Sequence, residues 1–364
     1  MEAYRMMAFY TRRQVMFKYI SGLLAVLLTT ALLMSCATSD GPTTEAMVPG
    51  TSSSTTQSTS STTGSTSGST TGTTAPTTTG TTAPEQPPLP ETETMRTVTN
   101  TGLYAAPNAE EAPVVTLEKD AHIEVAEQQG DWHMVVWEES LYYIPSAHVR
   151  QLGKYLVVID AGHQKVGNLD KEPDGPGSTT MKYKVSYGAT GSFSGMKEYE
   201  LNLLVSVKLQ AELERRGYEV VMIRTTHDVD ISNSERAMVA NNLYADAFIR
   251  IHANSSDNAN DSGVMTICQT SKNPYNASLY SQCRLLSDLV LTETVRATEA
   301  TKMYVWETDT MSGVNWCQVP VTIVEMGFMS NQAEDLRMAT DDYQQKLALG
   351  IANGIDLYIQ QTYN

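Results

Sequence analysis

Basic residues are scarce in this chain. Its 364 residues include 25 Lys and Arg against 41 Asp and Glu, which gives a formal net charge of -16 at pH 7. The few cations form no basic patch, and an acidic protein repels the phosphates of nucleic acids and of anionic lipid surfaces. We therefore expect no nucleic-acid partner and interpret the acidic excess as a feature that favours solubility.

Cysteine is also rare. The four cysteines are Cys36, Cys268, Cys283 and Cys317, too few for a disulfide framework in a chain of this length. None lies in a Cys-x-x-Cys spacing, so the sequence does not support a thiolate zinc site. If Cys36 is modified, at most one disulfide can form among the other three.

An apolar run near the N-terminus has the features of an export signal. Arg12, Arg13 and Lys18 precede the apolar run over residues 19–34, which is short for a helix that spans a bilayer. The run ends at Leu33-Met-Ser-Cys36, which resembles a bacterial lipobox. We therefore predict a signal peptide over residues 1–36 and a membrane tether through lipidated Cys36. Cleavage to a secreted form and an uncleaved anchor are the alternatives, and all three place the rest of the chain outside the cytoplasm, at the membrane surface or in the cell wall.

Residues 37–94 contain no Lys or Arg and consist almost entirely of Ser, Thr, Gly, Pro and Ala. Such a segment lacks the apolar side chains that would offset the entropy lost on ordering. We predict a disordered linker. A flexible tether of this kind suits a catalytic domain that searches a thick extracellular layer while fixed to a membrane.

Residues 95–152 show short apolar runs between turn signals, which predict a small all-β domain. The order of Gly102-Leu-Tyr104, Gly130-Asp-Trp132 and Tyr143-Ile-Pro-Ser146 resembles a bacterial SH3-like domain. Such domains often bind cell-wall peptides, and a barrel that serves only for packing or spacing is the alternative. The expected strands span 95–99, 114–117, 122–126, 132–137 and 141–144.

Residues 154–362 alternate between strand and helix patterns. Six strands of the buried type are expected at 155–161, 218–224, 247–252, 263–269, 303–306 and 321–325. Helical patterns occupy 198–216, 235–244, 275–298 and 341–362. This alternation predicts an α/β domain with an open, mostly parallel six-stranded sheet and helices on both faces.

Two histidines and two glutamates lie at the boundaries of these elements. His163, His252 and Glu325 end predicted strands, and Glu198 begins the first long helix. Ligands of open α/β sheets bind beyond the carboxyl ends of the strands, so the architecture can bring all four together. Two imidazoles and a carboxylate are the ligand set of a catalytic zinc, and a further carboxylate can act as base.

Each of these residues also has a structural explanation. A histidine at a strand end is more often structural than catalytic, and Glu198 alone can simply interact with the helix macrodipole. Glu325 is harder to explain in this way, because it lies in an apolar run, where a carboxylate is costly unless it is paired or bound to a metal.

Four segments of this domain resemble, in order, the motifs of the zinc-dependent N-acetylmuramoyl-L-alanine amidases. They are Val158-Ile-Asp-Ala-Gly-His163, Lys197-Glu-Tyr-Glu-Leu-Asn202, Arg250-Ile-His-Ala-Asn254 and Val324-Glu-Met-Gly-Phe-Met-Ser-Asn331. The resemblance covers essentially all of residues 154–362. It implies an amidohydrolase that acts on peptidoglycan, with one Zn²⁺ bound by His163, Glu198 and His252 and with Glu325 as the catalytic carboxylate.

The choice between two nearby glutamates depends on position. Glu198 lies four residues before Asn202, as the motif requires, while Glu200 lies roughly 200° further around a helix. The chain departs from the usual pattern at Gln164, which replaces a glycine, and in the longer segment 165–197, which we expect to line one wall of the substrate cleft.

Four further polar residues have less certain roles. We predict substrate contact for Gln164 and Asn254, with turning of the loop as the alternative for Gln164 and orientation of the site through hydrogen bonds as the alternative for Asn254. Arg224 and Arg236 can bind acidic groups of a substrate, or form internal ion pairs with Asp228, Asp246 or Glu235. Two other functions are compatible with the sequence: a zinc peptidase that cuts within the stem peptide, and a wall-binding protein without activity.

Overall fold

The structure is a computed structural model that describes residues 89–363. The predicted signal peptide, Cys36 and most of the predicted linker lie outside the described residues. Within residues 89–363, no helix combines the length and the apolar character that a membrane span requires.

Residues 93–151 form an all-β unit, as predicted. Its five-stranded antiparallel sheet has the order β6-β5-β4-β1-β7 and is made of β1 (Glu93–Thr97), β4 (His122–Gln129), β5 (Trp132–Trp137), β6 (Ser140–Pro145) and β7 (Val149–Gln151). A second pair joins β2 (Thr101–Leu103) to β3 (Val115–Leu117), and a 3-10 turn, η1 (Ser146–His148), precedes β7. Alternate residues of these strands, such as Ile123, Val125 and Val135, form a separate apolar core. Membership of the SH3-like class stays a prediction.

The rest of the described chain is built on a six-stranded sheet with the order β11-β8-β12-β15-β13-β14. Its strands are β8 (Leu156–Ala161), β11 (Glu219–Met222), β12 (Ala247–Asn254), β13 (Val264–Cys268), β14 (Lys302–Glu307) and β15 (Val321–Phe328). The first four strands in the sheet order are parallel. Strand β13 is antiparallel to β15 and parallel to β14, so the sheet is mixed. The predicted six strands and mostly parallel pairing are confirmed, with the β13-β14 pair reversed.

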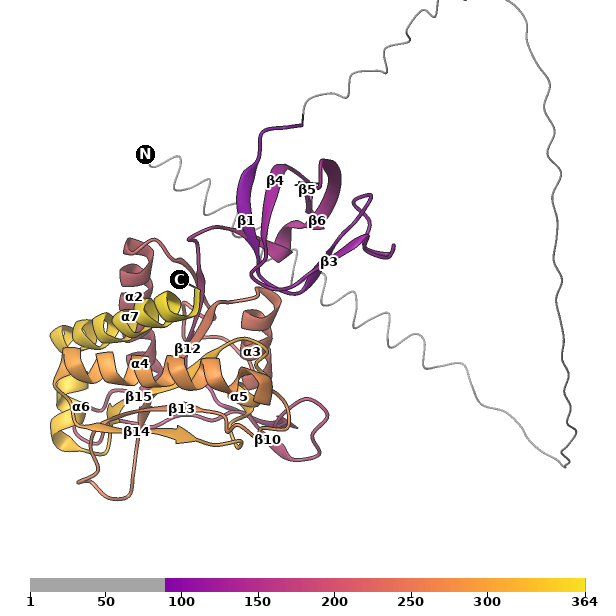
Figure 1. The fold of residues 1–364 in the computed structure, drawn as a ribbon. Coiled ribbons are helices and arrows are strands. Elements are labelled where there is room, and N and C mark those ends of the chain that lie inside the picture. Colours follow the sequence, from indigo (N-terminus) through magenta and orange to yellow (C-terminus); the bar gives the residue numbers. More distant parts are fainter. Residues whose placement is uncertain (1–88, 364) are drawn as a thin grey trace, which may run out of the picture. The chain divides into compact units, whose positions relative to one another are not determined.

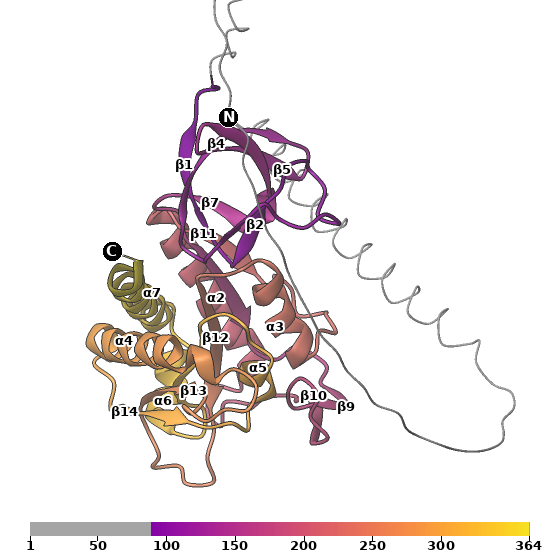
Figure 2. The same cartoon turned by 45° about the vertical axis from the view of Figure 1, so that its right-hand side comes forward.

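Helices cover both faces of this sheet (Figures 1 and 2). One face packs against α2 (Glu198–Arg215), α4 (Tyr280–Thr298) and α7 (Asp341–Tyr363), and the other packs against the shorter α3 (Asn233–Asn242) and α5 (Ser312–Asn315). A 3-10 turn, η2 (Ala277–Leu279), precedes α4, and α6 (Gln332–Met338) follows β15. The Ser232 hydroxyl caps α3 by accepting from the Glu235 amide at 3.2 Å, so this helix begins earlier than predicted.

The period of two in β12 decides where its polar residues point. Ile249 and Ile251 pack into the core beneath α2, α4 and α7, whereas Phe248 packs into the core beneath α3 and α5. Arg250 and His252 therefore share the face of Phe248.

The same alternation holds in the neighbouring strand β15. Val324 and Met326 face the first core and Ile323 faces the second, so Glu325 lies on the face of His252. The two residues are also direct register partners across the parallel β12-β15 pair. The polar residues of the central strands thus lie together on the face that α3 and α5 cover.

Candidate active site

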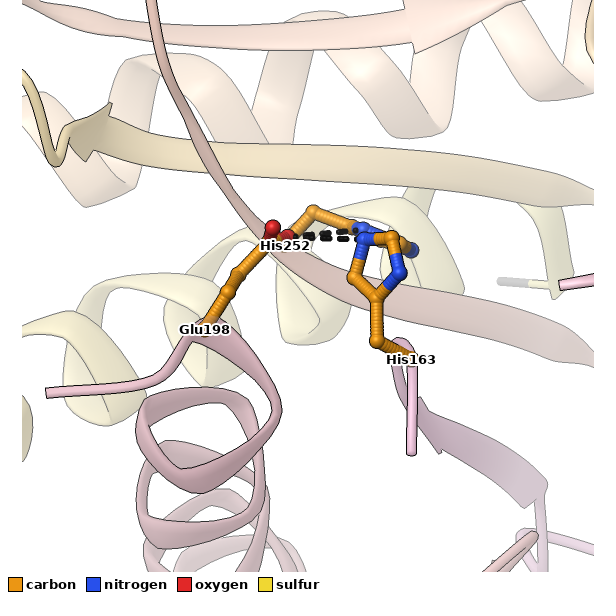
Figure 3. A group of neighbouring side chains, drawn as sticks. All are labelled: His163, Glu198 and His252. Atoms are coloured by element: carbon orange, nitrogen blue, oxygen red, sulfur yellow. Dashed lines mark hydrogen bonds and ion pairs between the residues drawn. The ribbon is translucent and has the colours of Figure 1, made fainter. Parts of the chain in front are cut away.

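The side chains of His163, Glu198 and His252 meet beside the ends of β8, α2 and β12 (Figure 3). One ligand atom from each lies within 4.8 Å of the others. Glu198 Oε1 is 3.1 Å from His163 Nε2 and 3.2 Å from His252 Nδ1. The structure therefore brings the three predicted ligands into one cluster. Glu200 does not join it, because its carboxylate accepts from the Lys197 amide at 3.1 Å and stabilises the start of α2.

Backbone groups hold the three side chains in place. Ser186 O is 2.9 Å from His163 Nδ1 and can accept a hydrogen bond from it, which leaves Nε2 directed at Glu198. The amides of Ala189 and Ala253 donate to the Glu198 carboxylate at 2.7 and 3.2 Å. Partners of this kind orient ligand side chains and raise their metal affinity.

Two glycines leave the space that this cluster occupies. A methyl group on Gly162 would overlap the His252 ring. Gly188 has a positive φ of +79°, and a methyl group there would stand 2.9 Å from Glu198 Oε2 and 3.0 Å from the His163 ring. Side chains at either position would push the nitrogen and oxygen donors apart.

Glu325 lies in the same cavity as both histidines, which has a volume of about 230 Å³. Its Oε2 is buried and has no hydrogen-bond partner among the described residues. Val185 and Ser186 form part of the wall, as expected for the 165–197 segment, which folds into a hairpin of β9 (Asn168–Pro173) and β10 (Met181–Val185). One prediction was wrong in detail: Glu325 lies inside β15, three residues before its end.

Burial and neighbouring charges set the protonation of these groups. Burial would raise the pKa of Glu198, but hydrogen bonds from His163 and His252 hold it well below its usual value. Burial lowers the pKa of His252 to about 4, so its imidazole is neutral at pH 7, as a metal ligand must be. Burial, reinforced by the negative charge of Glu198, raises the pKa of Glu325 to about 8.

Beneath the cavity, Asp160 is fully buried between two arginines. Its carboxylate lies 2.6 Å from Arg236 Nη1 and 2.9 Å from Arg250 Nε. Burial alone would raise the pKa of Asp160, but the two guanidinium charges outweigh it and hold that pKa well below the ordinary value.

We expect Asp160→Asn to lower the free energy of unfolding by about 3–5 kcal/mol at pH 7, because it leaves buried guanidinium groups without a counter-charge. The folded-state pKa is depressed, so this stabilisation is complete above the unfolded pKa, near 4, and is lost progressively as the pH falls from there through the lower folded-state pKa. Urea unfolding of both proteins at pH 7 and at pH 3 measures the effect. An equal difference at both pH values would contradict the charge explanation.

The other predicted polar residues have internal partners. Gln164 has no exposed surface; its amide donates to Val166 O at 3.1 Å, and its oxygen accepts from Arg236 at 2.9 Å. This packing fits the loop-turning alternative and leaves no surface for a substrate. Asn254 Oδ1 accepts from the Ser255 amide at 2.8 Å, and a contact of Asn254 with substrate stays a prediction.

The two arginines also point inwards. Arg224 donates to the carbonyls of Ala161, Gly162 and Tyr199 at 2.7–3.1 Å. Arg236 pairs with Asp160. Both arginines thus have internal partners, as the alternative prediction held. The suggested partners Asp228, Asp246 and Glu235 were wrong, because Asp160 and the carbonyls at the buried end of β8 are nearer acceptors.

A family model described as N-acetylmuramoyl-L-alanine amidase matches residues 157–357. The chain belongs to the N-acetylmuramoyl-L-alanine amidase family. The matched range holds the three clustered residues and Glu325, and it leaves out the small β unit.

Individual relatives share parts of this amidase domain. The chain is 32% identical over 174 residues to the uncharacterized protein YqiI of Bacillus subtilis (strain 168), which covers 48% of this chain and 79% of YqiI. It is 26% identical over 174 residues to the N-acetylmuramoyl-L-alanine amidase LytC of the same organism, with 47% of this chain and only 32% of LytC covered.

A solved structure shows the same fold. The apo form of the N-acetylmuramyl-L-alanine amidase Ami1 from Mycobacterium abscessus matches with a TM-score of 0.52 and 23% identity, over 56% of this chain and 98% of that one. The α/β architecture of the amidase domain is therefore shared with this enzyme.

Proposed function

We propose that residues 154–362 form a zinc-dependent N-acetylmuramoyl-L-alanine amidase. The enzyme hydrolyses the amide bond between the lactyl group of N-acetylmuramic acid and L-Ala of the peptidoglycan stem peptide. Family membership supports this reaction. The observation that carries the proposal is the presence of Glu325 and both histidines around one cavity.

His163, Glu198 and His252 fit a zinc ion by the chemistry of their donor atoms. Two nitrogens and one carboxylate oxygen lie within 4.8 Å of one another, and glycines keep the space around them free. A zinc ion bound there would polarise the amide carbonyl and make a water molecule more acidic. Glu198 is ionised and His252 is neutral, as metal ligands must be. Burial would lower the pKa of His163, but its hydrogen bond to Glu198 raises it, so a metal bound there would displace a proton.

Glu325 supplies the proton transfers. Its buried carboxylate lines the cavity and has one oxygen without a hydrogen-bond partner among the described residues, so it can take a proton from the attacking water. It can then give this proton to the nitrogen of the departing L-Ala. Positive charge in the cavity lowers the pKa of a buried carboxyl group, and so favours the ionised form that the first transfer needs. The products are a glycan with a free lactyl carboxylate and a released stem peptide.

The predicted anchor and linker give this activity a location. We propose that the amidase acts at the extracellular face of the cytoplasmic membrane, tethered through lipidated Cys36, with a secreted form as the alternative. The small β unit is proposed to be an SH3-like domain.

Mass spectrometry of purified peptidoglycan digested by the protein tests the proposal. We expect released stem peptides with a free L-Ala amine and muramic acid with a free lactyl carboxylate. Chelation of zinc should abolish the reaction, and added Zn²⁺ should restore it. Cleavage within the stem peptide would replace the amidase with a peptidase, and wall binding without new products would indicate an inactive binding protein.

A further inference from the structure

A further charged residue of the central strands lines the catalytic cavity. Arg250 lies in the middle of β12, and its side chain is only 4% exposed. It lines the cavity together with His163, His252 and Glu325. It is not one of the three clustered residues, and its charge opposes the rise that burial causes in the pKa of Glu325, without an ion pair to it.

Two of the three guanidinium nitrogens have partners that fix the group. Nε donates to Asp160 Oδ2 at 2.9 Å and Nη2 donates to Asn233 Oδ1 at 2.7 Å. The Asn233 amide in turn donates to Lys184 O at 2.8 Å, which anchors it to β10. Nη1 forms no hydrogen bond with any atom of residues 89–363. It is also not one of the fully buried polar atoms that lack a partner, so it keeps accessible surface. One amino group of a fixed cation is therefore free at the cavity wall.

Gly313 allows this position. The first turn of α5 passes directly beside the guanidinium group, and a methyl group on Gly313 would overlap Nη1. Any residue with a side chain there would displace Arg250 or close this part of the cavity. Gly313 lines the same cavity.

Arg250 and Arg236 share one buried counter-charge, Asp160. Asp160 already has a fully buried partner in Arg236, and one guanidinium group balances one carboxylate. Among the described residues, no ion pair joins Arg250 to Glu325. A desolvated cation without its own counter-charge is costly, and an anionic ligand group would remove that cost.

We propose that Nη1 of Arg250 binds a carboxylate of the stem peptide close to the scissile amide. This inference rests on the amidase reaction proposed above. The scissile amide is neutral, and the next group along the stem peptide that can be charged is the α-carboxylate of the second residue, D-Glu, which is linked onwards through its side chain. When that carboxyl group is amidated, its shape is kept but its charge is lost. Arg250 thus selects stem peptides with a free α-carboxylate, since charge-assisted hydrogen bonds are roughly twice as strong as neutral ones.

Two synthetic substrates test this selection: N-acetylmuramoyl-L-Ala-γ-D-Glu-L-Lys with the α-carboxyl of D-Glu either free or amidated. We expect the zinc-loaded wild type to have a kcat/KM at least about tenfold higher for the free acid. In Arg250→Gln the ratio of the two values should fall to about 1. Gly313→Ala, which keeps the charge but displaces it, should also lower the ratio. Zinc content and melting temperature show whether each variant is folded.

Three results separate the possibilities. A wild-type ratio near 1 overturns the inference. A drop in both rates of Arg250→Gln with an unchanged ratio also overturns it, because a purely structural arginine would act in this way. If the wild type leaves the lactyl amide of both substrates intact but cuts elsewhere in the peptide, the proposed amidase function fails instead.

Discussion

Glu198→Gln should lose both bound zinc and activity, whereas Glu200→Gln should keep both. Glu198 Oε1 lies between the two imidazoles, 3.1 Å from one and 3.2 Å from the other. An amide in its place lacks the charge that attracts the metal, and its NH₂ group repels it. Glu200 instead accepts from the Lys197 amide, away from the cluster. We expect Glu198→Gln to reduce turnover by about 1,000-fold or more, since Lewis-acid assistance is worth several kcal/mol.

The matched pair makes the result specific. Both variants remove one negative charge from the first turn of α2, so a general effect on the helix macrodipole would appear in both. Zinc per chain, measured by atomic emission after dialysis, should fall from one to near zero only in Glu198→Gln. If Glu200→Gln lost the metal and Glu198→Gln kept it, the ligand assignment would be wrong.

The four site residues were predictable because neighbouring parallel strands end at the same edge of a sheet. Strands β8, β12 and β15 are neighbours, and parallel neighbours present their carboxyl ends at one edge. His163 follows the end of β8, His252 lies within β12, and α2 begins with Glu198 at the same edge. The order of the motifs and the strand-helix alternation were therefore enough to bring these side chains together.

The position of Glu325 within β15 could not be predicted from the sequence. The sequence pattern of β15 does not show that the strand continues through Gly327 to Phe328, because glycine usually weakens a strand. The reversed β13 pairs with this longer strand, and Met265 is the register partner of Glu325. The site consequently lies partly on a face of the sheet, close to the carboxyl ends of β12 and β15, and not only beyond those ends.

Arg250 and Asp160 were missed although the sequence carried a signal. Both stand in apolar runs, Arg250 between Ile249 and Ile251, and Asp160 after Ile159. A charge in such a run is costly unless it is paired, so each of the two positions indicates a buried ion pair. Which charges pair could not be derived, since Asp160 and Arg236 are 76 residues apart.

The segment before α2 depends on contacts that no local pattern reveals. The Asp335 carboxylate, at the start of α6, accepts from the amides of Phe193 and Ser194 at 2.8 Å. A methyl group on Gly191 would overlap this carboxylate. Distant residues thus fix the loop that carries Ala189 to its hydrogen bond with Glu198.

Glu325→Gln should separate catalysis from metal binding. Glutamine keeps the shape of the side chain but accepts no proton from water, so we expect kcat to fall by about 1,000-fold, within the range for a lost general base. Zinc content should stay at one per chain, because Glu325 is outside the three-residue cluster. Stability should not fall, since burial already disfavours the charged form and raises the pKa of Glu325 to about 8.

Turnover of muropeptides, zinc content and thermal melting of Glu325→Gln decide the outcome, with Glu198→Gln as the comparison. An inactive protein that retains zinc and its melting temperature places Glu325 in the chemical step. Loss of zinc from Glu325→Gln would instead make this residue a ligand, and the base would have to be sought elsewhere in the cavity. Activity above a tenth of the wild type would remove Glu325 from the proton transfers, because no other carboxylate in the described chain lines the cavity.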